Sequence, residues 1–429
     1  MKKRIITVII FLGICGTGFS QQSNEKVLRL TLKEAQDYAL QHNKTVWNAG
    51  LSVSEAQKKT WETISAGLPQ VSATVSYQNM MGFSMSFAGL NISMPPTSNF
   101  QATITQLLFN GSYWVGIKMS KIGEEMTETA RLQAELDVKQ QTQSAYHAIL
   151  IAEENKKILE QNLTNIETLA KKTEDMVRIG VAEQTDADRM KIQVVTMTNA
   201  IKMIERNISL AYNLLRFHLG VGVETGIELA QTLDDLMDVN NIHSPLLRIF
   251  DVNSNYNIQL LDGQIDLSNM QISLAKSASL PTVAAFYSYT YKIAKSTFDM
   301  SPNNVIGLQA NIPIFASGQR YVHTQQAKIQ LEKAQNNREL VTDQLLMQEK
   351  QLRFNLNNAI ETLELQKVAI EVSQRVFESV SRKFQQGTAS SLDVTISSSE
   401  LLQTQTNYTN AMMQVLMAHT ELEKLLNTL

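Results

Sequence analysis

Two stretches of this 429-residue chain, 124–179 and 319–386, contain neither glycine nor proline. All seven prolines fall in three short zones, at positions 69, 95, 96, 245, 281, 302 and 313. Glycine and proline mark the turns that an ordinary globular enzyme needs at much shorter intervals, so their distribution argues against such a fold. It predicts two uninterrupted helices, over 112–179 and 319–386, each roughly 100 Å long at 1.5 Å per residue.

The first twenty residues have the features of an export signal. Lys2, Lys3 and Arg4 are followed by an apolar stretch over 5–15, and small residues precede a cleavage site before Gln21. Eleven apolar residues are fewer than the about 20 needed to span a bilayer, which leaves a buried N-terminal helix as the alternative. Residues 1–20 are therefore a predicted signal peptide. The large side chain of Ile14 argues against lipidation of Cys15, the chain's one cysteine.

Three landmarks occur twice, in the same order and about 210 residues apart. They are GLPQVSATVSY (67–77) with SLPTVAAFYSY (279–289), QLLFNGSYW (106–114) with IPIFASGQRY (312–321), and VRIGVAEQTD (177–186) with FQQGTASSLD (384–393). Unrelated turns that share common residues are the alternative. We predict two structural repeats, 21–231 and 232–429, which form one elongated unit and are linked through 218–245. Each repeat would run helix, strand, loop, strand, long helix, glycine turn, helix.

Four segments alternate apolar and small polar residues, as membrane barrel strands do. They are 70–78, 100–108, 283–292 and 304–314. A half-buried sheet in a soluble protein is the alternative for any one of them. Four strands cannot close a barrel, and open edges inside lipid would leave backbone groups without hydrogen bonds. A membrane location therefore requires several chains to share one barrel.

The remaining helical segments are about half as long as the two long helices. They are 32–65, 183–217, 246–278 and 391–427, and pairs of them placed end to end would match one long helix. Leu159, Leu163, Ile166 and Leu169 recur at spacings of three and four, which is typical of coiled-coil packing. The predicted fold class is mainly α, a long helical coiled-coil barrel with a membrane β part of four strands per chain.

Taken together, these landmarks resemble the TolC family of outer-membrane efflux and secretion channels. The resemblance rests on LTLKEAQDYAL (30–40), the paired Leu-Pro strand entries, the strand-exit turns and the paired Gly-x-Ala-x-x-x-Asp turns, and it covers the mature chain. It implies a homotrimer with a 12-stranded barrel in the bacterial outer membrane and a helical tunnel through the periplasm. It also implies two partners, a periplasmic adaptor (membrane fusion protein) and an inner-membrane transporter of an efflux pump or type I secretion system.

The glycine turns and the acids that follow them are the candidate functional sites. Gly180 and Gly387 each follow a long helix, where a residue able to adopt positive φ can reverse the chain. By the resemblance, these turns with Ala182 and Ala389 form the periplasmic tip that contacts the adaptor; a plain helical hairpin turn is compatible with that role.

Asp186 and Asp393 come next along the chain, at the start of a helix, where a carboxylate is favoured as a cap. If Asp393 faces the lumen, three-fold symmetry would place three carboxylates around a narrow pore and favour cations. Relatives place a second aspartate and an arginine lock where this chain has Ile396 and Ala389, and they often carry Asn-Pro where this chain has Asn43-Lys44. A double ring and that lock are therefore not expected.

Aromatic residues cluster where strands meet helices. Tyr113, Trp114, Phe315 and Tyr321 are candidates for the aromatic belt at a membrane interface, with core packing as the alternative. The loop before the second strand contains Met80, Met81, Met85 and Met94, whose thioethers could bind Cu(I) or Ag(I). Packing at the membrane rim is the preferred interpretation, and no metal site is predicted.

No enzyme motif or cofactor-binding motif is present, so the chain is predicted not to be an enzyme and to need no cofactor. Its six histidines are dispersed, and its net charge of −3 gives no reason to expect nucleic acid. We expect a passive exit duct in the outer membrane that extends into the periplasm. The alternative is an exported coiled-coil scaffold or adhesin without channel activity.

Overall fold

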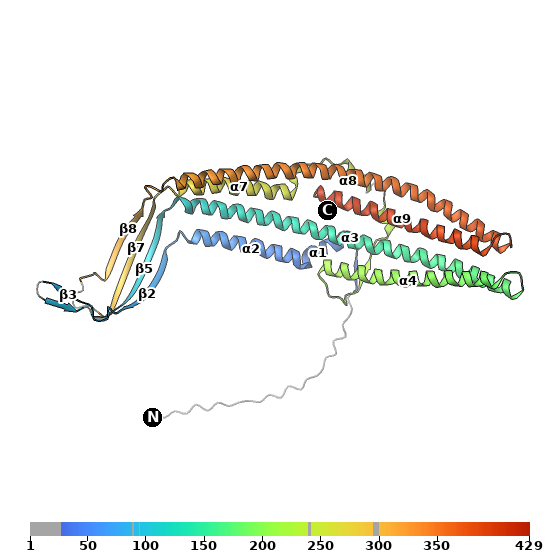
Figure 1. The fold of residues 1–429 in the computed structure, drawn as a ribbon, viewed down its shortest axis with the longest axis horizontal. Coiled ribbons are helices and arrows are strands. Elements are labelled where there is room, and N and C mark those ends of the chain that lie inside the picture. The colour runs from blue at the N-terminus through green and yellow to red at the C-terminus, as the bar shows by residue number, and fades with distance from the viewer. Residues whose placement is uncertain (1–26, 88–89, 94, 239–241, 295–299) are drawn as a thin grey trace, which may run out of the picture.

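The structure, a computed structural model, describes residues 27–87, 90–93, 95–238, 242–294 and 300–429. The predicted signal peptide with Cys15, and Met94 of the methionine-rich loop, lie outside the described residues. The molecule is elongated, with a small sheet at one end and long helices that run away from it (Figure 1).

The two longest helices, of 68 and 67 residues, extend from the sheet to the opposite end of the molecule. They are α3 (Gly111–Arg178) and α8 (Gln319–Gln385), so the prediction from the missing glycines and prolines is confirmed. Shorter helices stand end to end beside them: α2 (Lys44–Ser65) and α4 (Gln184–Leu219) along α3, α7 (Tyr256–Ser277) and α9 (Ser391–Leu425) along α8 (Figure 1). No helix in the described ranges is long and apolar enough to cross a bilayer.

Two of the predicted shorter helices are interrupted. The segment 32–65 is two helices, α1 (Leu32–His42) and α2, separated at Asn43. The segment 246–278 becomes α-helical only at Tyr256, after the 3₁₀ turns η1 (Ser244–Leu247) and η2 (Val252–Ser254). Asn43 and Asn255 both have an extended backbone, with ψ of 130°, which ends one helical path and begins another.

A buried asparagine joins the two helices of each end-to-end pair. The Asn43 side chain accepts from the backbone N–H of Thr45 (2.7 Å) and donates to the carbonyl of His218 at the end of α4 (2.7 Å). Asn255 accepts from the N–H of Asn257 (3.0 Å) and donates to the carbonyl of Leu425 at the end of α9 (3.4 Å). Each side-chain amide thus bridges the C-terminus of one helix and the N-terminus of the next, and the two helix dipoles point the same way.

The four predicted strands form one antiparallel sheet in the order β2-β5-β7-β8. They are β2 (Gln70–Gln78), β5 (Thr97–Phe109), β7 (Thr282–Ala294) and β8 (Asn304–Asn311). The central pair, β5 and β7, joins the first half of the chain to the second. Within the described part of the chain, β2 and β8 each pair on one side only.

The two faces of this sheet differ as the alternation predicts. Val71, Ile104, Tyr287 and Ile306 lie opposite one another across the strands, and all four side chains are exposed. On the other face Ser288 is buried, accepts from the Gln101 amide (2.7 Å) and contacts the Thr103 hydroxyl (3.2 Å). A sheet with one exposed apolar face and one hydrogen-bonded polar face suits a boundary between lipid and water.

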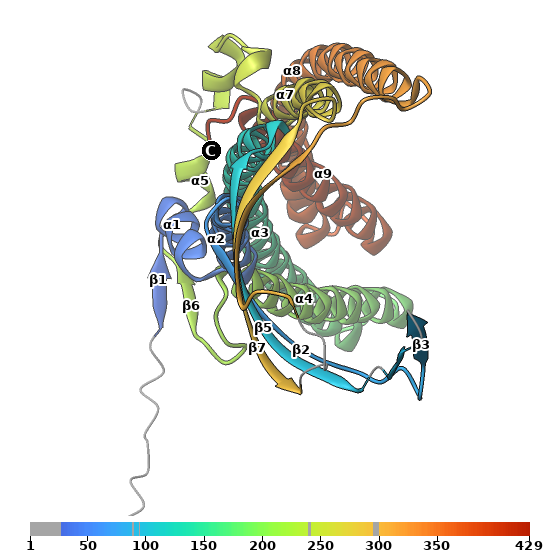
Figure 2. The same ribbon diagram turned by 90° about the vertical axis from the view of Figure 1, so that its left-hand side faces the viewer.

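Short elements that the sequence pattern did not predict surround the middle of the helices. The strands β1 (Leu28–Leu30) and β6 (Ile227–Leu229) pair in parallel, and they lie with α1 and α5 (Leu233–Leu236) on one side of the helical layer (Figure 2). A hairpin of β3 (Ser84–Phe87) and β4 (Leu90–Ser93) occupies part of the methionine-rich loop. The helical layer is curved, and β1, α1, α5 and β6 stand on its convex side (Figure 2).

The largest buried cluster lies in this middle region, where α1, α3, α4 and α9 meet. Tyr146 is fully buried there, and its hydroxyl donates to the carbonyl of Leu30 (3.1 Å) and so attaches β1 to α3. Next to it, His147 of α3 is 2% exposed, and its Nδ1 has no hydrogen-bond partner in the described residues. Burial, followed by the neighbouring His419 of α9, lowers the pKa of His147 to about 3.

Removal of the Asn43 amide should destabilise the chain more than removal of the Asn255 amide. Asn43→Ala leaves the His218 carbonyl and the first N–H groups of α2 without partners, at a cost of about 1–3 kcal/mol in unfolding free energy. Asn255→Ala should cost less, because its bond to Leu425 is the longer one. Denaturant unfolding followed by circular dichroism measures both; equal losses would contradict the predicted order, and no loss from either would contradict the bridging role.

Because its pKa is lowered on folding, His147 should make the free energy of unfolding fall as the pH is lowered. The unfolded chain binds a proton below pH 6.5 but the buried imidazole binds one only near pH 3, so stability is full above 6.5 and falls as pH drops between these values. The slope of the unfolding free energy approaches about 1.4 kcal/mol per pH unit. In His147→Gln the denaturant midpoint of unfolding should depend less on pH between 6.5 and 4 than in the wild type. The control His323→Gln, at an exposed position of α8, should keep the wild-type dependence.

Candidate functional site

Each of the two long helices ends in a turn at the tip of the molecule, and the two turns are of the same type. The N–H of Gly180 donates to Val177 (3.0 Å) and that of Val181 to Met176 (2.9 Å). In the second half, Gly387 donates to Phe384 (3.0 Å) and Thr388 to Lys383 (2.9 Å). This pair of bonds defines the Schellman motif, which satisfies the last carbonyls of a helix while the chain reverses.

Glycine is required in both turns by the backbone conformation. Gly180 has φ of +79° and Gly387 +73°, a region that other L-residues rarely adopt, while the space around both α-carbons is open. The prediction of positive φ at these two positions is confirmed. Ala182 and Ala389 are half-buried two residues later, and Ala389 packs against the apolar cluster that holds the tip together.

The two tip turns present different surfaces. Around Gly180 the flanking side chains are apolar and exposed, Ile179 at 71% and Val181 at 65%. Around Gly387 the corresponding residues are Gln386 and Thr388, which are polar and exposed. The apolar contact surface of the tip therefore comes mainly from the turn between α3 and α4.

Asp393 caps helix α9. Its carboxylate accepts from the N–H (2.9 Å) and hydroxyl (2.8 Å) of Ser390, whose hydroxyl accepts in turn from the Asp393 N–H (3.2 Å). The hydrogen bond from the Ser390 backbone, followed by that from its side chain, lowers the pKa of Asp393. The carboxylate is exposed, so the capping role leaves it accessible to solvent.

Asp186 connects the two tip turns to each other. Its carboxylate accepts from the backbone N–H of Glu183 (3.3 Å) at the start of α4, and from the hydroxyl of Ser391 at the start of α9. Ser391 is 1% exposed. Sequence reasoning identified Asp186 but missed Ser391, because the repeat aligns Asp186 with Asp393 and gives no signal that the turns contact each other.

The four candidate interfacial aromatics separate into two kinds. Tyr113 donates its hydroxyl to the carbonyl of Ile64 (2.9 Å), and its ring packs so closely on Gly67 that a Cβ there would lie 2.3 Å from it. Trp114, Phe315 and Tyr321 are 60%, 85% and 69% exposed. Tyr113 therefore holds the junction between the helices and β2, and the other three remain free to contact an interface.

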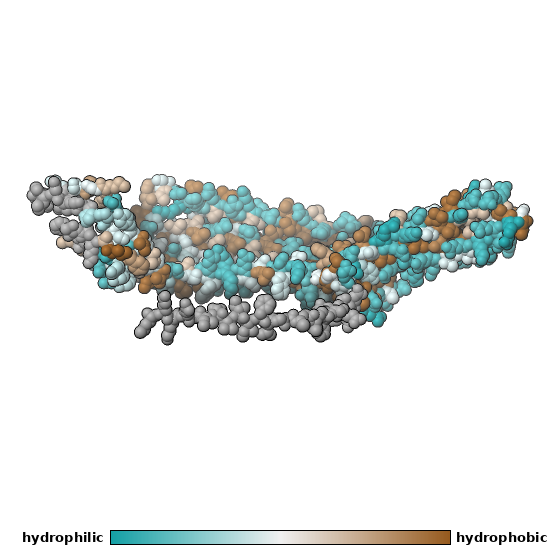
Figure 3. All heavy atoms as spheres, turned by 90° about the horizontal axis from the view of Figure 1, so that it is seen from below, coloured by the Kyte–Doolittle hydropathy of each residue, from teal (hydrophilic) through white to brown (hydrophobic). Residues whose placement is uncertain are grey.

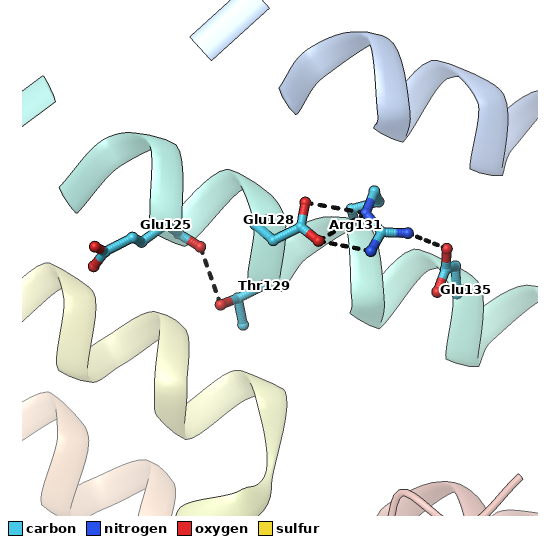
Figure 4. A network of polar contacts seen from close by, with 5 residues as sticks. All are labelled: Glu125, Glu128, Thr129, Arg131 and Glu135. Carbon is cyan, nitrogen blue, oxygen red and sulfur yellow. Dashed lines mark hydrogen bonds and ion pairs between the residues drawn. The ribbon is translucent and has the colours of Figure 1, made fainter. Parts of the chain in front are cut away.

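Figure 4 shows a charged cluster on α3, formed by Glu128, Arg131 and Glu135. Arg131 binds Glu128 on one side (2.6 Å) and Glu135 on the other, both one helical turn away. The hydrogen bond to Glu128 raises the pKa of the Arg131 guanidinium. All three charges belong to one helix, so they support its long exposed length and do not form a reactive centre.

No group of three or more histidine, cysteine, aspartate or glutamate side chains in the described ranges is placed to hold a metal ion. The features that stand out are instead an apolar sheet face, long paired helices and a two-turn tip.

Comparison with known proteins identifies the class to which this architecture belongs. The sequence model of the outer membrane efflux protein family matches residues 36–221 and 253–428. The chain is 21% identical to the outer membrane protein TolC of Vibrio cholerae over 397 residues, 88% of this chain and 87% of TolC.

Solved structures of outer-membrane proteins share the fold. VceC of Vibrio cholerae superposes with a TM-score of 0.73 at 15% identity, over 92% of this chain and 95% of VceC. The MtrE outer membrane channel of Neisseria gonorrhoeae gives 0.72 at 16% identity, over 92% of this chain and 88% of MtrE.

The chain belongs to the outer membrane efflux protein family. It is an exit duct of the bacterial outer membrane with a periplasmic extension, and it is a passive channel and not an enzyme. The predicted resemblance to the TolC family is confirmed, and the coiled-coil scaffold or adhesin is not favoured.

Proposed function

We propose that three copies of this chain form one exit duct, with a 12-stranded barrel in the outer membrane and a helical tunnel below it. The observation that carries the proposal is the sheet, whose apolar face is exposed and whose outer strands β2 and β8 each have an unpaired edge in the described residues. Pairing β8 of one copy with β2 of the next satisfies both edges, and a closed sheet leaves no backbone group open to lipid.

The free flanks of the helices support the same arrangement. On α4 an exposed apolar stripe faces away from α3; it consists of Ile192, Met203, Leu210, Leu214 and Phe217. On α8 a matching stripe faces away from α9; it consists of Leu340, Met347, Phe354, Leu365, Val372 and Val376. Figure 3 views the molecule from below, where α2 and α4 lie in Figure 1, and hydrophobic residues recur along the helices. Burial of one stripe against the other, copy to copy, would remove both from water.

Each end of the proposed duct would contact a different partner. The apolar sheet face would contact outer-membrane lipid, with Trp114, Phe315 and Tyr321 at the interface. At the other end, the turns with Gly180, Ala182, Gly387 and Ala389 would contact a periplasmic adaptor, with Ile179 and Val181 as apolar anchors. An inner-membrane transporter would supply cargo and energy, in a tripartite efflux pump or a type I secretion system.

Assembly should depend on the helical stripes. The purified wild-type protein is expected to migrate as an SDS-resistant trimer and to conduct ions in planar bilayers. Leu210→Asp places a charge in the α4 stripe and should reduce the trimer fraction by at least about tenfold, the effect of roughly 1.4 kcal/mol. Ser209→Asp, one residue outside the stripe, should leave trimers intact. A wild-type monomer without conductance would refute the proposed duct.

Asp393 and Asp186 are our candidates for the pore constriction, since three copies would bring each carboxylate near the axis of the tip. Asp393→Asn keeps an acceptor for the Ser390 bonds but removes three charges per trimer. The ratio of cation to anion permeability, measured from reversal potentials in a salt gradient, should fall by about twofold or more. An unchanged ratio, with trimers intact, would limit Asp393 to its capping role.

A further inference from the structure

The exposed face of helix α9 carries no charge over most of its length. From the tip toward the middle, this face consists of Leu392, Ile396, Ser399, Gln403, Thr406, Asn407, Asn410 and Gln414. Gln403 and Asn407 bond to each other along the face (2.9 Å). Acids stand only at or near its ends: Asp393 and Glu400 at the tip, and Glu421 in the middle of the molecule.

The opposite face of α9 is fixed to the convex side of the layer. Met412 and Leu416 belong to the buried cluster that includes α1 and β1. At about 100° per residue, Met412 lies about 180° around the helix from Gln403. Since α1 and β1 stand on the convex side (Figure 2), the uncharged face of α9 is turned to the concave side.

Helix α8 also has an amide side near the middle of the molecule, opposite a charged one. On one side Arg353, paired with Glu349, donates to the carbonyls of Leu246 (2.7 Å) and Arg248 (2.5 Å) in the segment that precedes α7. Between Arg353 and the tip, most charged residues of α8 lie on this same side of the helix; they are Glu364, Lys367, Glu371, Glu378 and Arg382. The other side is exposed and amide-rich, and it consists of Gln344, Gln348, Gln351, Asn355 and Asn358.

Helical spacing separates these two sides. Asn355 lies about 160° around the helix from Arg353, whereas Asn357 lies about 40° from Arg353, on the charged side. Gln351 donates to Asn355 (2.7 Å), so the amides of this side bond to one another as they do on α9. Both helices thus turn neutral amides to one face; the opposite side carries charged residues on α8 and buried apolar residues on α9.

We infer that the amide faces of α8 and α9 line the tunnel of the assembled duct and make the part of its wall that these two helices supply electrically neutral between the tip and the middle. This rests on the proposed trimer, in which three curved layers close with their concave faces inward. Amide groups can donate to anions and accept from cations, so they solvate both signs without selecting either. Such a wall suits polar cargo of either charge, zwitterions and neutral compounds, and it leaves charge selection to the acids at the tip.

A matched pair of substitutions tests this assignment. Asn355→Asp would place three carboxylates in the lumen, and the cation-to-anion permeability ratio of trimers in planar bilayers should rise at least about threefold. Asn357→Asp adds the same charges on the other side of the same helix, and the ratio should change by less than about 1.5-fold, because water and salt screen those charges from the lumen. Gln403→Glu on α9 should repeat the result of Asn355→Asp.

The possible outcomes separate this inference from the proposed function. A raised ratio for Asn355→Asp and Gln403→Glu but not for Asn357→Asp supports the neutral wall. Equal effects of Asn355→Asp and Asn357→Asp, or none from either, in trimers that conduct would overturn it and leave the duct intact. Failure of the wild-type chain to form conducting trimers would remove the proposed duct and the inference together.

Discussion

The architecture depends on the need of every strand edge for a hydrogen-bonding partner. The sheet has an exposed apolar face, which water disfavours, and two edges that lipid would leave unsatisfied. In the proposed duct, neighbouring copies on both sides would meet these requirements together, and they would fix the position of the helices below. A chain that supplies four strands of the proposed 12-stranded barrel would consequently be stable in a membrane only as part of an assembly.

Each pair of end-to-end helices, α2 with α4 and α7 with α9, forms one continuous path beside a long helix, from the sheet to the tip (Figure 1). The Asn43 and Asn255 amides replace the backbone hydrogen bonds that are lost where one helix ends and the next begins. At the tip, the Asp186–Ser391 bond holds the two hairpins of one chain together. Glycine supplies the conformation of each turn, and Asp186 and Asp393 complete the capping boxes of α4 and α9 with Glu183 and Ser390.

Sequence reasoning predicted the long helices, the four strands and both tip turns, because these depend on local signals. The absence of glycine and proline predicted the extent of α3 and α8, and the period-two alternation predicted β2 and β5. Gly180 and Gly387 predicted the turns because glycine readily adopts positive φ. The break at Asn43 was missed because the apolar periodicity continues across it. The contact between Asp186 and Ser391 was missed because it joins segments more than 200 residues apart, and no local pattern records such a pairing. The short strands β1 and β6 were missed for the same reason, since each is three residues long and is stabilised by the other.

The end-to-end placement of the shorter helices has a consequence for how such a chain can change in length. Between the middle of the molecule and the tip, α3 runs beside α4 and α8 beside α9, so residues lost from one helix leave its neighbour unmatched (Figure 1). Coiled-coil packing repeats about every seven residues, so a tolerated change removes or adds a whole heptad in all four helices at once. Reach across the periplasm would therefore evolve in steps of about 10 Å, at 1.5 Å per residue, while the sheet and the asparagine joints stay as they are.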